Sequence, residues 1–486
     1  MCLEASSEVF RLYAVELVRR LRARELSCVE LMEATLKRID ALNPTFNAIV
    51  ALRDRDELLA EAKAKDSGPA GGALFGLPLA VKDLAAARGM RMTMGSPLLE
   101  HFVPSEDSIF VERLRAAGAI LIGKTNTPEF GLGSQTYNPV FGVTRNAYDP
   151  ALTAGGSSGG AAVALALRMV ALSDGSDYGG SLRNPAGWNN VYGFRPSIGR
   201  VPGDGREAWL PSMAVNGPMA RNPADLALLL SVMAGYDPRE PLSLAGDGQE
   251  FAAPLGEPRK GLRIAWAADW NGAFPCEQGV LAVCEQALKV FERMGLVVEP
   301  AVPDFSFDEL WEAFVRLRCW QASANLLPFW SDPAMRKLLK PEAQWEVECG
   351  AKLSAFDISA ASASRTRFTH AIRRFLGDYD FLVLPTAQVF PFPVETHWPA
   401  EIAGRRMTTY HEWMKCVVPA TMMGGPALAA PAGFDARGLP MGIQIIGRNR
   451  AELDCLSLAA AYHEAARPDL REPRALRKPS TPSAFS

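Results

Sequence analysis

Apolar and polar positions alternate along this chain with periods that predict helices in some stretches and strands in others. From about Glu8 to Asp66, apolar residues recur at helical spacing in VFRLYAVELVRRLRA and VELMEATLKRIDAL, which predicts amphipathic helices that serve as scaffold. Ser27 precedes the second helix and is expected to cap it. The next apolar run, LPLAVK, ends at Lys82 and is typical of a short buried strand.

Helices and strands continue to alternate after this point. FVERLRAAG predicts a helix and AILIGK a strand. GGAAVALALRMVAL predicts a buried helix of about four turns. From Asn216 to Gly235 the pattern predicts a turn and then an amphipathic helix, and residues 277–294 predict another helix. GLRIAWAAD, YDFLVLPT and GIQIIG predict further strands. This alternation indicates an α/β fold in which helices cover a sheet.

Two later stretches stand out by composition. The segment from Tyr236 to Lys260 is rich in Pro, Gly and charge and is expected to be an insertion or surface connection. Six of the ten tryptophans lie between Trp311 and Trp413. Most of these aromatic residues fit an ordinary helical core. The others are interpreted as lining an apolar substrate cleft, because ligand pockets are mostly apolar.

Composition excludes several classes of protein. The chain has 486 residues, 48% of them hydrophobic and 22% charged, and a net charge of −3. It therefore offers no electrostatic case for binding nucleic acid or an anionic membrane. The N-terminus lacks the apolar core of a signal peptide, and prolines interrupt the uncharged run from Cys416 to Phe434. The eight cysteines form no metal-ligand spacing, which favours reduced thiols in a cytoplasmic enzyme.

The candidate chemistry is concentrated between Ala151 and Gly203, where glycines flank two serines. Ser157 lies in GGSSGG and Ser181 in SDYGGSLR. Glycines let the backbone turn sharply and bring N–H groups close to a reacting atom. A serine nucleophile also needs a base, and no pattern ties any of the five histidines to these serines. Lys82 is the candidate base.

GGSSGG on its own has two other interpretations, a flexible linker or a phosphate cradle. A linker would not continue directly into a buried helix. A phosphate loop would need a Gly-Lys-Ser/Thr ending that is missing here.

Lys82, GGSSGG, the motif D-x-G-G-S-x-R-x-P-A and GFRPSIGRVP together resemble the amidase signature family, whose hydrolases use a serine, a cis-serine and a lysine. The similarity extends to LIGKTNTPEFG, YDFLVLPT and GGPALAAPAGFDARGLPMGIQIIG, and so covers most of the chain. It implies an α/β fold with a central mixed, twisted β-sheet covered by helices on both faces. It also implies a single amidase domain over 1–486, with an N-terminal helical part (1–69), a catalytic signature core (70–235) and a C-terminal α/β part (260–470). The variable substrate-cleft region would be 304–411.

The resemblance implies a role for each catalytic residue. Ser181 would be the nucleophile. Ser157, which follows a cis Gly156–Ser157 peptide in the family, would relay its proton to Lys82. Lys82 acts as a base only when neutral, so burial must lower its pKa by several units from about 10.4.

Further residues would support this chemistry. The backbone N–H groups of Tyr178, Gly179, Gly180 and Ser181 would form the oxyanion hole. Tyr178 departs from the small residue or threonine that is commoner there in the family, and its ring is expected to narrow the cleft. Three side chains would support the site. Ser158 would do so by a hydrogen bond or as a helix N-cap. Asp177 and Arg183 would form a pair that fixes the loop, unless the two form only a surface ion pair.

The implied activity is hydrolysis of a carboxylic amide to an acid and ammonia or an amine, through a serine acyl-enzyme and without a metal or organic cofactor. The expected partner is a small-molecule amide with an apolar or aryl acyl group. A homodimer is left open, and no nucleic acid or membrane is expected. The alternatives are an amidotransferase A-type subunit that releases ammonia within a complex, and a catalytically inactive binding protein. Residues 203–221 lack the continuation that is usual in the amidotransferase protein.

Overall fold

A single large sheet forms the framework of the molecule. The computed structural model describes residues 9–203, 207–210, 213–468 and 471–477. Within these ranges, 11 strands follow the order β1-β3-β2-β6-β8-β7-β14-β15-β11-β9-β10. The strands are β1 (Ile49–Val50), β2 (Pro78–Lys82), β3 (Ile120–Thr125), β6 (Leu172–Asp177), β7 (Tyr192–Arg195), β8 (Val215–Ala220), β9 (Arg263–Trp266), β10 (Val297–Pro300), β11 (Phe381–Pro385), β14 (Ala427–Phe434) and β15 (Pro440–Ile446).

The sheet is mixed, as the family resemblance implies. Strand β2 runs parallel to β3 and β6, and β9 runs parallel to β10 and β11. The central pairs β6–β8, β8–β7, β7–β14 and β14–β15 are antiparallel. The β7–β14 pair joins strands of the 70–235 part to strands of the 260–470 part in one sheet. Two small hairpins stand apart, β4 (Tyr137–Asn138) with β5 (Gly142–Val143) and β12 (Glu401–Ile402) with β13 (Arg405–Arg406).

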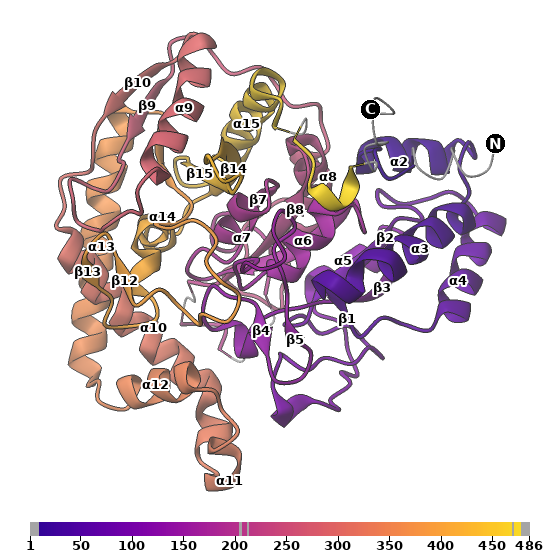
Figure 1. Cartoon of the computed structure of the whole chain (residues 1–486), viewed down its shortest axis with the longest axis horizontal. Coiled ribbons are helices and arrows are strands. Elements are labelled where there is room, and N and C mark those ends of the chain that lie inside the picture. The colour runs from indigo at the N-terminus through magenta and orange to yellow at the C-terminus, as the bar shows by residue number, and fades with distance from the viewer. Residues whose placement is uncertain (1–8, 204–206, 211–212, 469–470, 478–486) are drawn as a thin grey trace, which may run out of the picture.

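Helices flank this sheet (Figure 1). Helices α6 and α7 pack on the sheet and on each other, while α15 packs on both α8 and α9, which also contact the sheet. The helices are α2 (Ala14–Arg22), α3 (Cys28–Phe46), α4 (Arg55–Ser67), α5 (Ile109–Ala116), α6 (Gly159–Ala166), α7 (Arg183–Trp188), α8 (Pro223–Met233), α9 (Val280–Arg293), α10 (Phe307–Trp330), α11 (Pro333–Arg336), α12 (Pro341–Gly350), α13 (Ala355–Asp378), α14 (Val418–Met423) and α15 (Glu452–Ala466). None of the helices in the described ranges combines the length and apolar character that crossing a membrane requires.

Most of the predicted elements are confirmed, and two differ. Ser27 caps α3 through a capping box with Glu30, as expected. Helix α6 ends at Ala166 after 8 residues, well short of the predicted four turns. The reason is local, because Arg168 takes a left-handed conformation with φ 58° and turns the chain toward β6.

The turn predicted from Asn216 is the second difference, because these residues belong to strand β8. Gly217 makes the pairing possible. A Cβ atom at this position would lie 2.1 Å from the carbonyl oxygen of Phe194, so only glycine allows so close an approach. The Asn-Gly-Pro sequence therefore marks a tightly packed strand.

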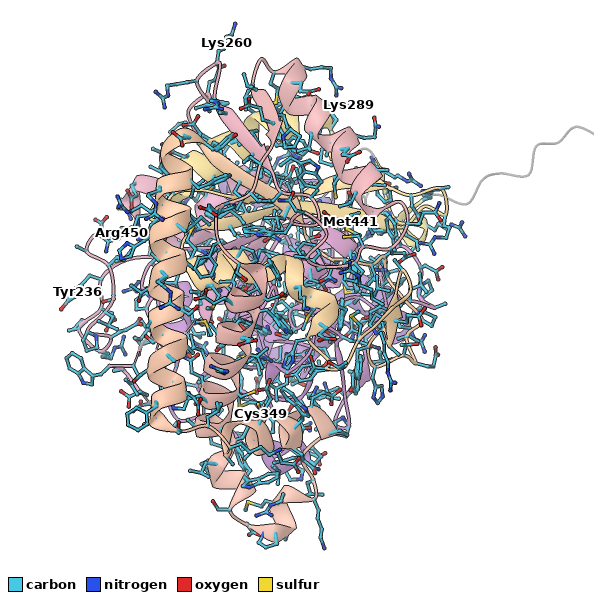
Figure 2. The ribbon with its side chains drawn as sticks, turned by 90° about the vertical axis from the view of Figure 1, so that its left-hand side faces the viewer. Tyr236, Lys260, Lys289, Cys349, Met441 and Arg450 are labelled. Atoms are coloured by element: carbon cyan, nitrogen blue, oxygen red, sulfur yellow. The ribbon has the colours of Figure 1, made fainter. Side chains whose placement is uncertain are left out.

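The tryptophan-rich region forms a helical layer beside the sheet. Figure 2 shows the two long helices α10 and α13 side by side, with Cys349 of α12 near their lower end. Helix α12 packs against α10, and a small separate core joins α10, the α11–α12 segment and the loop near residue 132. The residues of that core are Leu132, Leu326, Leu339, Ala343 and Val347. Phe314 and Arg318 of α10 line the same cleft as Ser181, so this layer lies beside the candidate site.

Candidate active site

Lys82 occupies the end of β2, and its side chain is almost fully enclosed, with 1% exposure. Its backbone N–H donates to Oδ1 of Asp174 at 3.0 Å, which fixes the strand end against β6. The Nζ atom lies 2.7 Å from Oγ of Ser157, 2.9 Å from Oγ of Ser158 and 3.0 Å from Oγ of Ser176. The fold thus brings three hydroxyl groups to one buried amine.

Burial changes the protonation of this lysine. Removal from water lowers the pKa of Lys82 from 10.5 to about 7, although the charges of Asp174 and Asp177 act to raise it. Burial also raises the pKa of Asp174 to about 6. A large share of Lys82 is therefore the neutral amine near pH 7, the form that accepts a proton.

Ser157 and Ser158 lie at the N-terminal end of α6. The Gly156–Ser157 peptide is cis, as the family resemblance implies. Gly156 and Gly160 make room for close packing, since a Cβ would lie 3.0 Å from the backbone nitrogen of Gln135 and 2.3 Å from that of Asn126, respectively. Ser158 is the N-cap residue of α6, but its side chain makes no capping bond and contacts Lys82. Of its two predicted supporting roles, the hydrogen bond is the one that the structure contains.

Ser181 lies on the turn between β6 and α7. Gly180 supplies the turn with a positive φ of 91°, and its position packs so closely on Val417 that a Cβ would lie 2.9 Å from that side chain. The backbone N–H of Ser158 donates to the carbonyl oxygen of Ser181 at 3.2 Å, which joins the two glycine-rich segments. Within the described chain, the Ser181 and Ser157 hydroxyls share no hydrogen bond.

The predicted oxyanion donors differ in their availability. The N–H of Gly180 donates to Oδ1 of Asp177 at 3.0 Å, so it is already engaged. No acceptor among the described residues engages the N–H groups of Tyr178, Gly179 or Ser181. These three donors are therefore available at the turn that carries the Ser181 hydroxyl.

Asp177 and Arg183 form a fully buried pair, so the surface ion pair considered from the sequence is wrong. Arg183 donates from Nε and Nη2 to the two carboxylate oxygens of Asp177, each at 2.9 Å. Nη1 of Arg195 lies 3.2 Å from Oδ1 of Asp177. Burial would raise the pKa of Asp177, but the two guanidinium groups outweigh it and hold the pKa below its usual range. The bidentate geometry fixes the Ser181 turn.

A narrow cleft opens at the turn that carries Ser181. It measures about 20 Å³, room for one water-sized group. Tyr178 forms part of its wall, with its hydroxyl donating to Oε1 of Gln321 at 2.7 Å. The lining residues are Gly131, Gly133, Ser134, Tyr178, Gly179, Ser181, Phe314, Arg318, His411, Met414 and Val417. Three of them, Phe314, Arg318 and His411, come from the region predicted to vary with the substrate.

Sequence reasoning missed two polar residues of this site. Ser176 directly precedes Asp177 in SDGSDYGGS, and the alternation along a strand was the signal that could have placed it beside Lys82. Arg318 lies within a helical stretch that carries no motif. Lys124 and Glu129 of the LIGKTNTPEFG motif bond to other residues. Lys124 donates to the Ala85 carbonyl, while Glu129 accepts from Ser96 and from the Lys340 backbone.

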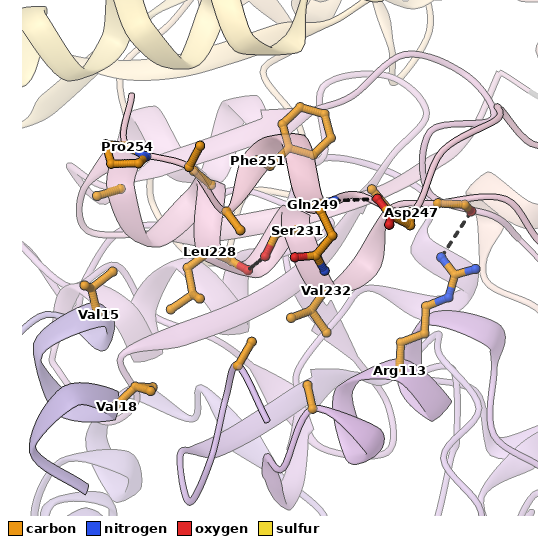
Figure 3. A pocket seen from close by; sticks show the side chains of 18 of the residues that line it. Val15, Val18, Arg113, Leu228, Ser231, Val232, Asp247, Gln249, Phe251 and Pro254 are labelled. Atoms are coloured by element: carbon orange, nitrogen blue, oxygen red, sulfur yellow. Dashed lines mark hydrogen bonds between the residues drawn. The ribbon is translucent and has the colours of Figure 1, made fainter. Parts of the chain in front are cut away.

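A larger cavity of about 1210 Å³ lies elsewhere, between α2, α8 and residues 246–255 (Figure 3). None of the predicted site residues lines it. Arg19, Arg22 and Arg113 are the arginines that line it, and Arg113 donates to backbone carbonyls of residues 233, 235 and 236. Across the described residues, no group of three or more His, Cys, Asp or Glu is arranged to hold a metal ion.

Comparisons with known proteins agree over nearly the whole chain. A family model described as Amidase matches residues 30–456. An acylamidase of Rhodococcus erythropolis is 34% identical over 464 residues, which cover 94% of this chain and 96% of the relative. The A-type subunit of the glutamyl-tRNA(Gln) amidotransferase from Thermus thermophilus is 37% identical over 485 residues, with 95% and 98% covered. The crystal structure of a bacterial aryl acylamidase of the amidase signature enzymes matches with a TM-score of 0.87 and 29% identity, covering 94% of this chain and 97% of that one.

Proposed function

The chain belongs to the amidase signature family, and on that premise we propose that it hydrolyses a small carboxylic amide through a serine acyl-enzyme. The observation that carries the proposal is the contact of 2.7 Å between Nζ of buried Lys82 and Oγ of Ser157, beside the turn that carries Ser181. A lysine with this environment is a base near neutral pH.

In the acylation step, Oγ of Ser181 attacks the carbonyl carbon of the amide. Its proton passes to Oγ of Ser157 as the Ser157 proton passes to Nζ of Lys82. The backbone N–H groups of Tyr178, Gly179 and Ser181 stabilise the oxyanion, and each such donor typically contributes about 10²–10³ in rate. The two serine hydroxyls come into hydrogen-bond contact when substrate binds, since such bonds are often long or misaligned in free enzymes.

The remaining steps use the same proton relay, first from Lys82 to the leaving amine and then from water to Lys82. The Lys82 ammonium returns its proton through Ser157 to the departing amine, and the C–N bond breaks. A water molecule then attacks the acyl carbon and gives its proton to Lys82 by the same relay. The bond between that carbon and Oγ of Ser181 breaks, the proton returns through Ser157 to Ser181, and the carboxylic acid leaves. The hydroxyls of Ser158 and Ser176 keep Nζ in place throughout, at 2.9 and 3.0 Å.

The cleft supports a small acyl group with apolar or aryl character. Phe314, Met414 and Val417 supply apolar walls. These walls must move to admit an acyl group, because the cleft of about 20 Å³ holds only one water-sized group. We expect benzamide to be turned over faster than acetamide. A clear preference for acetamide, measured by ammonia release, would reject the apolar or aryl preference.

An amidotransferase A-type subunit is the second candidate, favoured by the 37% identity to the Thermus thermophilus protein. The sequence difference noted in residues 203–221 falls partly on positions 204–206 and 211–212, which lie outside the described residues. Purified chain that hydrolyses simple amides alone supports the hydrolase. Activity that requires partner proteins and ATP supports the amidotransferase.

The proposed mechanism is tested by replacing the nucleophile. Ser181→Ala should abolish amide turnover while circular dichroism and thermal unfolding stay those of the parent protein. Ser173→Ala is the matched control, because Ser173 lies buried on β6, the strand that precedes the Ser181 turn, and donates only to backbone carbonyls. Acid quenching during turnover should give an acyl mass increment on the peptide that contains Ser181. Full activity of Ser181→Ala would contradict the mechanism.

A further inference from the structure

Arg318 brings a cation to the wall of the cleft that Ser181 also lines. It lies on α10 and is 7% exposed. Its Nε donates to Oε1 of Glu346 at 2.7 Å, and its Nη2 donates to the Tyr410 hydroxyl at 2.9 Å. Nothing in the described part of the chain accepts a hydrogen bond from Nη1. The two N–H groups of Nη1 and the second N–H of Nη2 are therefore the donors left for a molecule in the cleft.

The neighbours of Arg318 fix its position, and one of them balances its charge without lining the cleft. Glu346 is fully buried and is absent from the cleft lining. Burial would raise its pKa, but Arg318 and hydrogen bonds from His411 and Tyr410 lower it to about 2, so Glu346 is a carboxylate. The guanidinium carbon lies 5.1 Å from the ring centroid of Tyr178. This cation–π contact further restrains the guanidinium group.

No negative charge competes with Arg318 inside the cleft. Of the described residues that line it, Arg318 alone carries a charged side chain. His411 also lines it, but burial lowers the His411 pKa and favours the neutral ring. A group that enters the cleft beside Ser181 thus meets a cation that is already held in position. The counter-ion of that cation, Glu346, does not line the cleft.

We propose that Arg318 binds a carboxylate carried by the acyl part of the substrate, so that the enzyme acts on monoamides of dicarboxylic acids. This inference rests on the proposed amide hydrolysis and refines its substrate class. An ionised acceptor fits because a charge-assisted hydrogen bond is about twice as strong as a neutral one. The apolar walls contact the methylene stem between the carboxylate and the scissile carbonyl.

The test compares succinamate with butanamide, which has a methyl group in place of the carboxylate. Binding is measured by calorimetry on Ser181→Ala, which separates recognition from chemistry, and turnover on the parent enzyme by ammonia release. We expect succinamate to bind about 10-fold tighter or more and to show a similar advantage in kcat/KM. Equal binding of the two amides, or equal use of succinamate and 4-oxopentanamide, would overturn the proposal.

Variants then assign the preference to Arg318. Arg318→Met with Glu346→Gln removes the cation and its buried counter-ion together, so that no lone charge remains in the interior. Arg318→Lys keeps the charge but loses the fork of donors. Both variants should lose the advantage of succinamate over butanamide, mainly in KM. The matched control is Arg316→Met on the same helix, an exposed arginine near Glu312, which should keep the advantage.

The two proposals fail in different ways. Preferential binding of succinamate without turnover of any amide would reject the hydrolase mechanism and leave the carboxylate site standing. Turnover of butanamide at the same kcat/KM as succinamate would reject the carboxylate site and leave the hydrolase standing. Retention of the full preference in both Arg318 variants would also overturn the role of Arg318.

Discussion

The protonation state of Lys82 should control the rate, which makes the pH profile the most informative measurement. Only the neutral amine accepts the proton relayed from Ser181, so kcat/KM should rise with pH and level off once Lys82 is neutral. The pKa of about 7 places the midpoint of this rise near pH 7. At pH 5, two units lower, about 1% of Lys82 is neutral, so kcat/KM should be about 100-fold below its plateau.

The structure sets the size of the effect. Burial shifts the pKa of Lys82 from 10.5 to about 7, which corresponds to about 5 kcal/mol of preference for the neutral form. At pH 7 this shift gives about 1,000-fold more neutral amine than an exposed lysine would have. The buried position of Nζ therefore accounts for roughly three orders of magnitude in available base.

A single substitution should move the profile in a known direction. The Asp174 carboxylate favours the ammonium form and so raises the pKa of Lys82. Asp174→Asn removes that charge and keeps an oxygen for the Lys82 backbone N–H, so the rise should move to lower pH. Asp225→Asn is the matched control. Asp225 is equally buried but holds the N-terminus of α2, so this change should leave the midpoint unchanged.

The assay is steady-state hydrolysis of p-nitroacetanilide from pH 5 to pH 10, because neither this substrate nor its leaving amine ionises in that range. Thermal unfolding at each pH checks that the enzyme stays folded. A rise centred above pH 9 would refute the buried neutral lysine. A shift of the Asp174→Asn midpoint to higher pH would refute the assigned electrostatics.

Three further substitutions test the site and its support. Lys82→Met should lower kcat/KM by at least about 10²-fold with unchanged thermal stability, because it removes the base; near-parent activity would contradict the role of Lys82. Arg183→Met should lower the free energy of unfolding, measured in urea, by about 3–5 kcal/mol, since it leaves Asp177 buried without its partner; a loss under 1 kcal/mol would count against the clamp. Gly187→Ala should cost about 1–3 kcal/mol because its Cβ would lie 2.2 Å from a threonine Oγ1 atom. Gly377→Ala, in open space on α13, should be neutral or stabilising.

The sequence predicted the contact between Lys82 and Ser157 better than it predicted the surroundings of the site. Lys82, Ser157 and Ser181 lie in motifs whose glycines have a direct physical purpose, so their proximity could be predicted. Local patterns also gave most helices and strands, since apolar spacing reports which face is buried. Contacts between residues far apart in the chain leave no such pattern in the sequence. Nothing in the sequence around Arg318 indicates that it reaches the cleft.

The two misjudged elements show where local reasoning stops. Helix α6 ends early because Arg168 turns the chain left-handed, although LALRMVAL has good helical character. Asn216 and Gly217 have turn propensity, yet pairing with β6 places them in a strand. For Asn216 and Gly217, pairing within the sheet outweighs the turn preference.

The contacts by which Arg183 holds the turn that carries Ser181 have a consequence for biosynthesis. Nη1 of Arg183 donates to the carbonyl oxygen of Val417 at 2.8 Å and to Oε1 of Gln444 on β15 at 2.6 Å. Lys82, Ser157, Ser181 and Asp177 leave the ribosome with the first part of the chain, but two partners of Arg183, Val417 and Gln444, emerge near the end. A nascent chain should therefore stay inactive until Val417 and Gln444 have emerged.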